Sequence, residues 1–316
     1  MAKKKIDKNV KDMTRAEWLN LRREGIGGSD AGAIMGLNRY SSPVKVWMDK
    51  TGRGRDKDID SDSMRFGRDM EEYVAKRWEE ASGKRVRRNN YMLMHDEYPF
   101  MLADLDREVV GENAILECKT ANAFMADDWK GDNIPQHYVI QCLHYLAVTG
   151  ADKCYLACMI GNGHMEYRCI DRDETAINIM IKREKEFWEN YVIANQMPPA
   201  DGSENADNVL LESYPAVDES REEIEILSVK SLDRYDEVCD LLDSLAKEKK
   251  KIEQIIKMEM EDAQYAFIGD RHITWKARKG SSRIDGKTLH KEKPEIYERY
   301  LKVGKPTRVF KIQSKE

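Results

Sequence analysis

The chain has 316 residues, and its 58 acidic and 53 basic side chains leave a net charge of −5. This length is enough for one large core or two domains. No apolar run approaches the length of a membrane span, and the lysines near the start are not followed by the apolar segment of a secretory signal. The six cysteines form no C-x-x-C pair. This argues against a disulfide framework and a zinc site, and indicates a reducing cytoplasm.

The charges are unevenly distributed. Residues 201–262 contain nineteen acids and eight bases, whereas residues 271–311 contain thirteen bases and four acids. An acidic segment followed by a basic one permits a local DNA-binding surface despite the acidic total. An ordinary charged surface would give the same counts, so the charges alone leave both interpretations open.

Capping signals and apolar periodicity place the helices. Thr14, followed three positions later by Glu17, forms a capping box at the start of a helix. A Pro near the start and a Gly just past the end bound another helix over residues 134–150. Apolar residues at helical spacing predict a seam within residues 221–262, for packing on the core or for self-association. The predicted helices cover residues 14–25, 30–35, 64–82, 134–150 and 173–195, a short stretch after Ser42-Pro43, and one or two segments within 221–262.

Two or three strands are expected between residues 85 and 120, and a hairpin is expected to join residues 153–160 to 164–171 around a Gly-Asn-Gly turn. Further strands are expected over 266–276 and 307–312. This order of helices and strands predicts one α/β core. The expected organisation is a flexible basic tail (1–13), a core (14–197), a linker (198–219), a helical segment that could form a coiled coil (220–263) and a basic β-rich segment (264–316).

Residues 114–120, Ala-Ile-Leu-Glu-Cys-Lys-Thr, carry the main chemical signal. Side chains alternate between the faces of a strand, so Glu117 and Lys119 project from the same face. A turn at residues 111–113 can bring Asp106 alongside Glu117. Two carboxylates and an ammonium suit a hard divalent cation and a water to be activated, as in a nuclease. A solvated strand face also carries Glu and Lys, so this motif alone is a weak signal.

Other motifs occur in a consistent order around this one. The sequence Phe-Gly-Arg-Asp-Met-Glu-Glu at residues 66–72 lies on a helix, Trp18 and Arg22 precede the glycine-rich turn at 25–30, and Gln141 and Tyr145 share one helix face. Taken together, these segments resemble the YqaJ-type viral recombinase family, in the lambda-exonuclease-like branch of the PD-(D/E)xK nucleases. The resemblance covers about residues 14–170. It implies an α/β fold of the α+β type. This is a restriction-endonuclease-like core with a mixed central sheet flanked by helices, followed by a C-terminal helical segment and a small β-rich tail.

The resemblance also implies roles for individual residues. Asp106 and Glu117 would be the central metal ligands, with the backbone carbonyl of Cys118 as a further donor, and Lys119 would position and help deprotonate the attacking water. Glu71 matches the family's upstream helix acid, and would complete the metal site or contact its waters. The rival acids, which a shift of the alignment would exchange for these, are Glu72 and Asp104.

The remaining matched positions concern DNA. Arg22 and Ser29 match residues that bind phosphate near the DNA end, and backbone N–H groups of the glycine turn could assist them. Gln141 matches the family glutamine behind the catalytic strands, and Tyr145 lies one turn later. One departure is Leu105, which stands where the family often has proline.

The function implied by the resemblance is that of a phage-type recombination exonuclease in the cytoplasm of a bacterial host. It would use one or two Mg²⁺ ions, with Mn²⁺ as a substitute, to degrade one strand of linear duplex DNA in the 5'→3' direction. The resulting 3' overhangs would pass to a single-strand annealing recombinase. A homo-oligomeric, trimeric ring around the DNA is also implied, and no membrane association is expected.

Two other functions remain open at this point. A structure-selective endonuclease or nickase could use the same site, and it would cut closed circular DNA. A non-catalytic DNA-binding adaptor in recombination could keep the fold, although the intact set of Asp106, Glu117 and Lys119 argues against an idle site.

Overall fold

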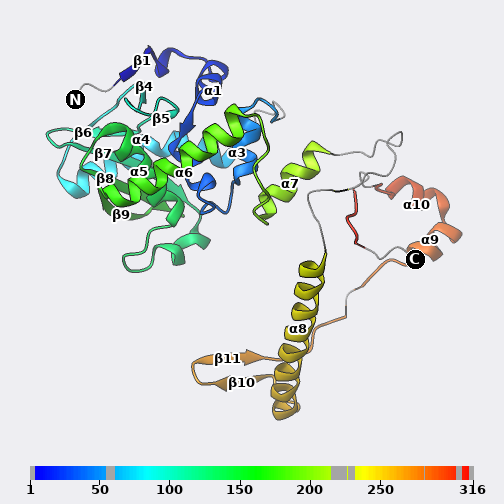
Figure 1. Cartoon of the computed structure of the whole chain (residues 1–316). Coiled ribbons are helices and arrows are strands. Elements are labelled where there is room, and N and C mark those ends of the chain that lie inside the picture. Colours follow the sequence, from blue (N-terminus) through cyan, green and yellow to red (C-terminus); the bar gives the residue numbers. More distant parts are fainter. Residues whose placement is uncertain are drawn as a thin grey trace. The chain divides into compact units, whose positions relative to one another are not determined.

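The computed structural model describes residues 4–54, 61–214, 226, 232–280, 282–303 and 308–312. The chain divides into two compact units, Met1–Pro215 and Ala216–Glu316. Figure 1 labels most of the helices and strands of both units.

A five-stranded mixed sheet forms the centre of the first unit, in the order β3-β6-β7-β8-β9. Figure 1 labels β6, β7, β8 and β9 of this sheet. β7 and β8 run parallel, and the other neighbouring strands run antiparallel. The predicted hairpin over residues 153–160 and 164–171 is confirmed with the same bounds. The strands are β3 (Val86–Arg87), β6 (Arg107–Val109), β7 (Ala114–Ala121), β8 (Lys153–Ile160) and β9 (His164–Asp171).

Helices cover both faces of this sheet. On one face, Val74 and Trp78 of α4 (Asp62–Ser82) pack against Leu116 of β7. On the other face, apolar residues of α5 (Gln136–Thr149) and α6 (Glu174–Phe187) pack against β8. Burial of these apolar side chains is the main stabilising contribution to such a core. The predicted mixed α/β core with a central sheet flanked by helices is therefore confirmed.

A second sheet of the first unit, in the order β1-β4-β5-β2, connects the N-terminal helices to this core. The parallel pairing of β2 with β5 places Ile26 opposite Met101. A Cβ added at Gly25 would lie 2.5 Å from the carbonyl oxygen of Phe100, so this approach requires glycine. The elements are β1 (Lys4–Asn9), β2 (Ile26–Gly27), β4 (Tyr91–Met94), β5 (Met101–Ala103), α1 (Arg15–Arg23), α2 (Gly28–Ile34) and α3 (Pro43–Lys50).

The capping box at Thr14 and Glu17 is confirmed at the start of α1. The helix predicted over 173–195 is also present, but it changes after α6 into a π-helical segment, Trp188–Ile193. Short 3-10 segments lie at Val10–Asp12 and Ala123–Trp129.

Three segments differ from the expectation. Within the expected tail, β1 pairs antiparallel with β4. Within the expected linker, α7 (Glu204–Ser213) begins at the N-cap Ser203 and buries Ala206 and Val209, so tertiary contact favours a helix there. The single strand expected over 266–276 is instead a hairpin of β10 (Tyr265–Ile268) and β11 (Arg271–Thr274), because Gly269 turns the chain with a φ of 60°.

The second unit contains one long helix, α8 (Asp233–Met260), the β10–β11 hairpin, and the short helices α9 (Gly286–Glu292) and α10 (Pro294–Tyr300). The described residues 308–312 belong to no helix or strand, where a strand was predicted. Of the helices in the described ranges, none is both long and apolar enough to cross a membrane.

A buried ion pair joins two helices of the core. The Nδ1 atom of His144 in α5 lies 2.8 Å from a carboxylate oxygen of Glu184 in α6, and its Nε2 atom lies 3.0 Å from the carbonyl oxygen of Leu102. Neither side chain of the pair is exposed. Burial lowers the pKa of His144, but Glu184 and the Leu102 carbonyl outweigh burial and raise the pKa above its usual value of 6.5.

We expect His144→Ala to lower the free energy of unfolding by about 3–5 kcal/mol at about pH 6, because Glu184 is left buried without its partner. The stabilisation is complete below the unfolded-state pKa of about 6.5 and is lost as pH rises through the raised folded-state pKa. The loss caused by the substitution should therefore shrink as pH rises, in urea denaturation measured across this range.

The matched control is His164→Ala, which removes an exposed histidine 2.8 Å from Glu166. Because exposed pairs contribute little, its expected loss is below about 1 kcal/mol. Equal losses for the two variants, or a loss for His144→Ala that grows with pH, would contradict the assignment.

Candidate active site

Asp106 and Glu117 are brought together by the pairing of β6 with β7. Asp106 lies in the bend immediately before β6, and the register places Arg107 opposite Leu116. Asp106 therefore lies beside Glu117, and its carboxylate accepts a hydrogen bond of 2.7 Å from the backbone N–H of Cys118. The juxtaposition expected from the sequence is present, although Asp106 lies in a bend rather than within a strand.

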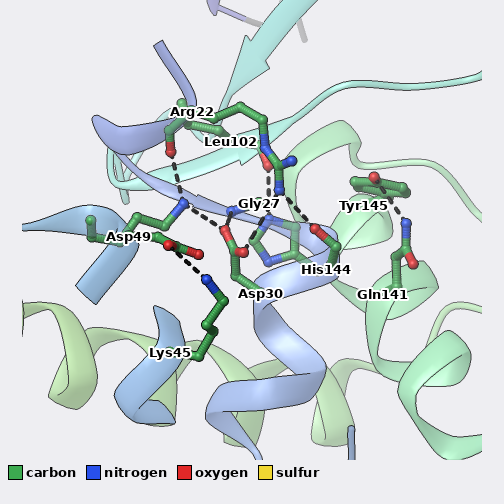
Figure 2. A network of polar contacts seen from close by, with 11 residues as sticks. Arg22, Gly27, Asp30, Lys45, Asp49, Leu102, Gln141, His144 and Tyr145 are labelled. Carbon is green, nitrogen blue, oxygen red and sulfur yellow. Dashed lines mark hydrogen bonds and ion pairs between the residues drawn. The ribbon is translucent and has the colours of Figure 1, made fainter. Parts of the chain in front are cut away.

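Glu117 is held by two donors from different directions. Lys119, two residues later on the same face of β7, lies 2.6 Å from its Oε1 atom. The side-chain amide of Gln141 in α5 donates to the same oxygen at 2.7 Å and to the hydroxyl of Tyr145 at 3.1 Å. Figure 2 shows Gln141 and Tyr145 facing each other on α5. The helix thus fixes the orientation of the strand carboxylate.

The site concentrates charge in a buried place. Burial raises the pKa of Asp106 well above its usual range, and the charges of Glu117 and Glu71 raise it further. Burial also raises the pKa of Glu117, although Lys119 opposes this rise. Burial lowers the pKa of Lys119, but Glu117 and Asp106 outweigh burial and raise it above the usual value. Lys119 is therefore an ammonium group in this arrangement.

The thiol of Cys118 faces away from these groups. It packs with Val74 and Trp78 of α4, on the opposite side of β7. Burial raises its pKa well above the usual value, and Asp106 adds to this rise. Only the backbone of Cys118 is available to the site.

The upstream helix acids are bound by an arginine that the sequence analysis did not single out. Arg107, whose side chain is 4% exposed, forms an ion pair with Glu71 and contacts Glu72 at 2.9 Å. It also donates to the carbonyl oxygen of Asp106 at 2.5 Å. The only sign of this contact in the sequence was that Arg107, a charged residue, directly follows Asp106 within a short strand. Glu72 also pairs with Arg88.

The carboxylates of Asp106 and Glu117 are the oxygen donors that could hold a cation. Among the residues that the structure describes, no group of three or more His, Cys, Asp or Glu side chains is arranged to bind a metal ion. The pair still fits a hard cation, because it offers only oxygen. The negative charges of Glu117 and Glu71 raise the pKa of Asp106, and a bound cation would relieve this repulsion.

An open cleft of about 800 Å³ contains this site. Its walls come from α1, the glycine-rich turn, α4, β5, β7 and α5. Asp104 also lines the cleft, where it accepts a 2.9 Å hydrogen bond from the indole of Trp18. Every residue predicted for the site lines this one cleft: Arg22, Ser29, Glu71, Asp106, Glu117, Cys118, Lys119, Gln141 and Tyr145.

Arg22 and Ser29 lie together on one side of the cleft. The Nη2 atom of Arg22 donates to the hydroxyl of Ser29 at 2.8 Å, and its guanidinium lies 4.9 Å from the ring centroid of Trp18. Stacking and hydrogen bonding together hold the guanidinium in place. Its planar set of N–H donors suits the binding of an anion.

Comparison with known proteins supports the sequence resemblance. The family described as YqaJ-like viral recombinase domain matches residues 17–152. The YqaJ protein of Bacillus subtilis strain 168 is 40% identical over 309 residues, which cover 96% of this chain and 95% of that protein. The chain belongs to the YqaJ-like viral recombinase family. The part matched by the family description contains every predicted site residue, and the Bacillus relative extends through the second unit as well.

Two solved structures were also found to be similar to this YqaJ-family chain. An alkaline exonuclease from Laribacter hongkongensis is 17% identical, covers 57% of this chain and 93% of its own, and gives a TM-score of 0.49. A phage-related exonuclease from Haemophilus somnus is 14% identical, covers 56% of this chain and 98% of its own, and gives a TM-score of 0.42.

We expect Gly28→Ala to destabilise the protein by about 1–3 kcal/mol through overpacking. A Cβ at Gly28 would lie 2.6 Å from the Tyr145 ring and 3.0 Å from Gln141, the residues behind Glu117. The matched control is Gly67→Ala in α4, where the nearest atom would be 3.6 Å away. Because alanine favours a helix, the control should leave stability unchanged or raise it by up to about 1 kcal/mol. Urea denaturation compares the two, and equal effects would contradict the packing argument.

Proposed function

We propose that this chain is a divalent-metal-dependent deoxyribonuclease of recombination. It removes nucleotides from one strand of linear duplex DNA in the 5'→3' direction and leaves 3' overhangs. The observation that carries the proposal is the meeting of Asp106, Glu117 and Lys119 in one open cleft. Membership of the viral recombinase family supports it.

The residues divide the chemistry of phosphodiester hydrolysis among them. Asp106 and Glu117 would hold Mg²⁺, or Mn²⁺ in its place, with the Cys118 carbonyl as a further donor and Glu71 at the edge of the site. Such a cation, when bound, neutralises charge on the scissile phosphate and lowers the pKa of a water. Lys119 donates a hydrogen bond that orients the nucleophile or stabilises charge on a phosphate oxygen. Gln141 keeps Glu117 in place.

An exonuclease must recognise a DNA end. Arg22 and Ser29 lie in the same cleft as the acids and offer a guanidinium and a hydroxyl to a phosphate. We therefore assign them to the terminal 5'-phosphate. The 3' overhang would be taken up by a single-strand annealing protein in the bacterial cytoplasm, and the enzyme would act as a homo-oligomeric ring. These partners follow from the family resemblance.

We expect Lys119→Ala to reduce cleavage of linear, 5'-phosphorylated duplex DNA by at least about a hundredfold, since it removes the group that orients the reacting water or phosphate. The matched control is Lys182→Ala, which removes an exposed lysine of α6. Nucleotide release with Mg²⁺ is measured for both variants and the parent, on the linear DNA and on the same DNA as a closed circle.

Release from the linear form alone, lost only in Lys119→Ala, is the expected result. Cutting of the circle would instead favour the endonuclease, and the absence of cleavage in the parent would favour a non-catalytic adaptor. Cleavage by Lys119→Ala at the parental rate would overturn the assignment of the site.

Removal of divalent metal should abolish nucleotide release. We expect release to stop in EDTA and to return on addition of excess Mg²⁺ or Mn²⁺, because the oxygen-only donor set favours these hard cations. Asp106→Asn should show no return at the same metal concentration. Undiminished release in EDTA would rule out the metal-dependent mechanism.

A further inference from the structure

A buried ion network lies behind Arg22, outside the cleft. It consists of Lys50, the last residue of α3, and Asp30, in the first turn of α2. The Lys50 side chain is 4% exposed, and neither residue lines the cleft. The function proposed above gives these two residues no role.

The contacts of the network connect three helices. The Nζ atom of Lys50 lies 2.6 Å from Oδ2 of Asp30 and donates to the carbonyl oxygen of Arg22 at 2.8 Å. Asp30 also accepts a hydrogen bond of 2.9 Å from the backbone N–H of Gly27. Its other oxygen, Oδ1, lies 3.7 Å from Nη2 of Arg22. Figure 2 shows Arg22, Gly27 and Asp30 gathered around this point.

The distances show how the charges are shared. Asp30 is much closer to Lys50 than to Arg22. Burial raises the pKa of Asp30, but Lys50 and Arg22 together outweigh burial and lower it to about 2, so the residue is a carboxylate at neutral pH. Burial lowers the pKa of Lys50, and the charge of Asp30, 2.6 Å away, opposes this shift. With Lys50 as an ammonium group, two cations and one anion leave one net positive charge. Because Lys50 neutralises Asp30, that charge remains on the Arg22 guanidinium, which faces the cleft.

Stability alone does not account for a buried lysine here. Burying an ion pair costs about as much desolvation energy as the attraction within the pair recovers. Apolar residues of similar volume often give the same stability or more. Without Lys50, however, Asp30 would pair with Arg22 and cancel the charge that an anion needs.

We propose that Lys50 is a positioning and charge-balancing residue for recognition of the terminal phosphate. It binds Asp30 and the Arg22 backbone, and so leaves the Arg22 guanidinium correctly placed and uncancelled. This inference rests on the phosphate subsite of the proposed function, but not on hydrolysis.

The test measures binding rather than cleavage. Short duplexes with a 3' fluorophore and either a 5'-phosphate or a 5'-hydroxyl are titrated in EDTA, and the ratio of the two dissociation constants is determined by fluorescence anisotropy. Because both values come from the same preparation, a partly unfolded fraction cancels in the ratio. The variants are Lys50→Met, Asp30→Asn with Lys50→Met, and Lys45→Met. The last is the matched control, because Lys45 lies on the same helix in an exposed pair with Asp49 (Figure 2).

The parent and Lys45→Met should prefer the 5'-phosphate. In Lys50→Met the ratio of the two dissociation constants should fall about tenfold, the size expected for one charge-assisted hydrogen bond. The double variant should recover most of it, since no unpaired Asp30 remains to cancel Arg22. If Lys50 acted only by holding the Arg22 carbonyl, the double variant would show no recovery, because it lacks that hydrogen bond as well.

Three results would overturn the inference: no 5'-phosphate preference in the parent, an unchanged preference in Lys50→Met, or no recovery in the double variant. If Lys50→Met does not fold, the double variant alone decides. A double variant that lacks the 5'-phosphate preference overturns the inference, and a double variant that keeps the preference supports it. A parent that prefers the 5'-phosphate but does not cleave DNA would contradict the nuclease proposal while leaving this inference intact.

Discussion

The antiparallel pairing of β6 with β7 is the constraint on which the site depends. It holds two carboxylates, Asp106 and Glu117, side by side in a buried place where their charges repel. The backbone of Cys118 and the side chains of Lys119 and Gln141 offset this repulsion with directed hydrogen bonds. The sheet and its covering helices thus keep the two carboxyl groups closer together than two free carboxylates would stay in water.

Much of this arrangement could be predicted from local sequence. Alternation along a strand placed Glu117 with Lys119, and the turn after β6 set the register that brings Asp106 beside them. Helical spacing placed Gln141 and Tyr145 on one face of α5. Each of these predictions depends on residues close together in the chain, where backbone geometry limits the possible arrangements.

The contacts that were missed join distant parts of the chain. Arg107 reaches Glu71 on α4, and Lys50 reaches the end of α1. No periodic pattern marks such pairs, because their partners are set by how helices pack on the sheets. Packing against the rest of the unit also explains why α7 forms a helix, although the polar composition of its segment predicted a linker.

The orientation of Cys118 has a consequence for the choice of metal and for chemical resistance. A cysteine in the middle of the acid-bearing strand could offer a sulfur ligand to Zn²⁺ or Cd²⁺, which bind thiolates strongly. Here the sulfur lies against α4 and its pKa is raised, so little thiolate forms. We therefore expect the Cys118 sulfur to react little with soft metals, alkylating reagents and oxidants, while the oxygen donors of the same strand face the cleft.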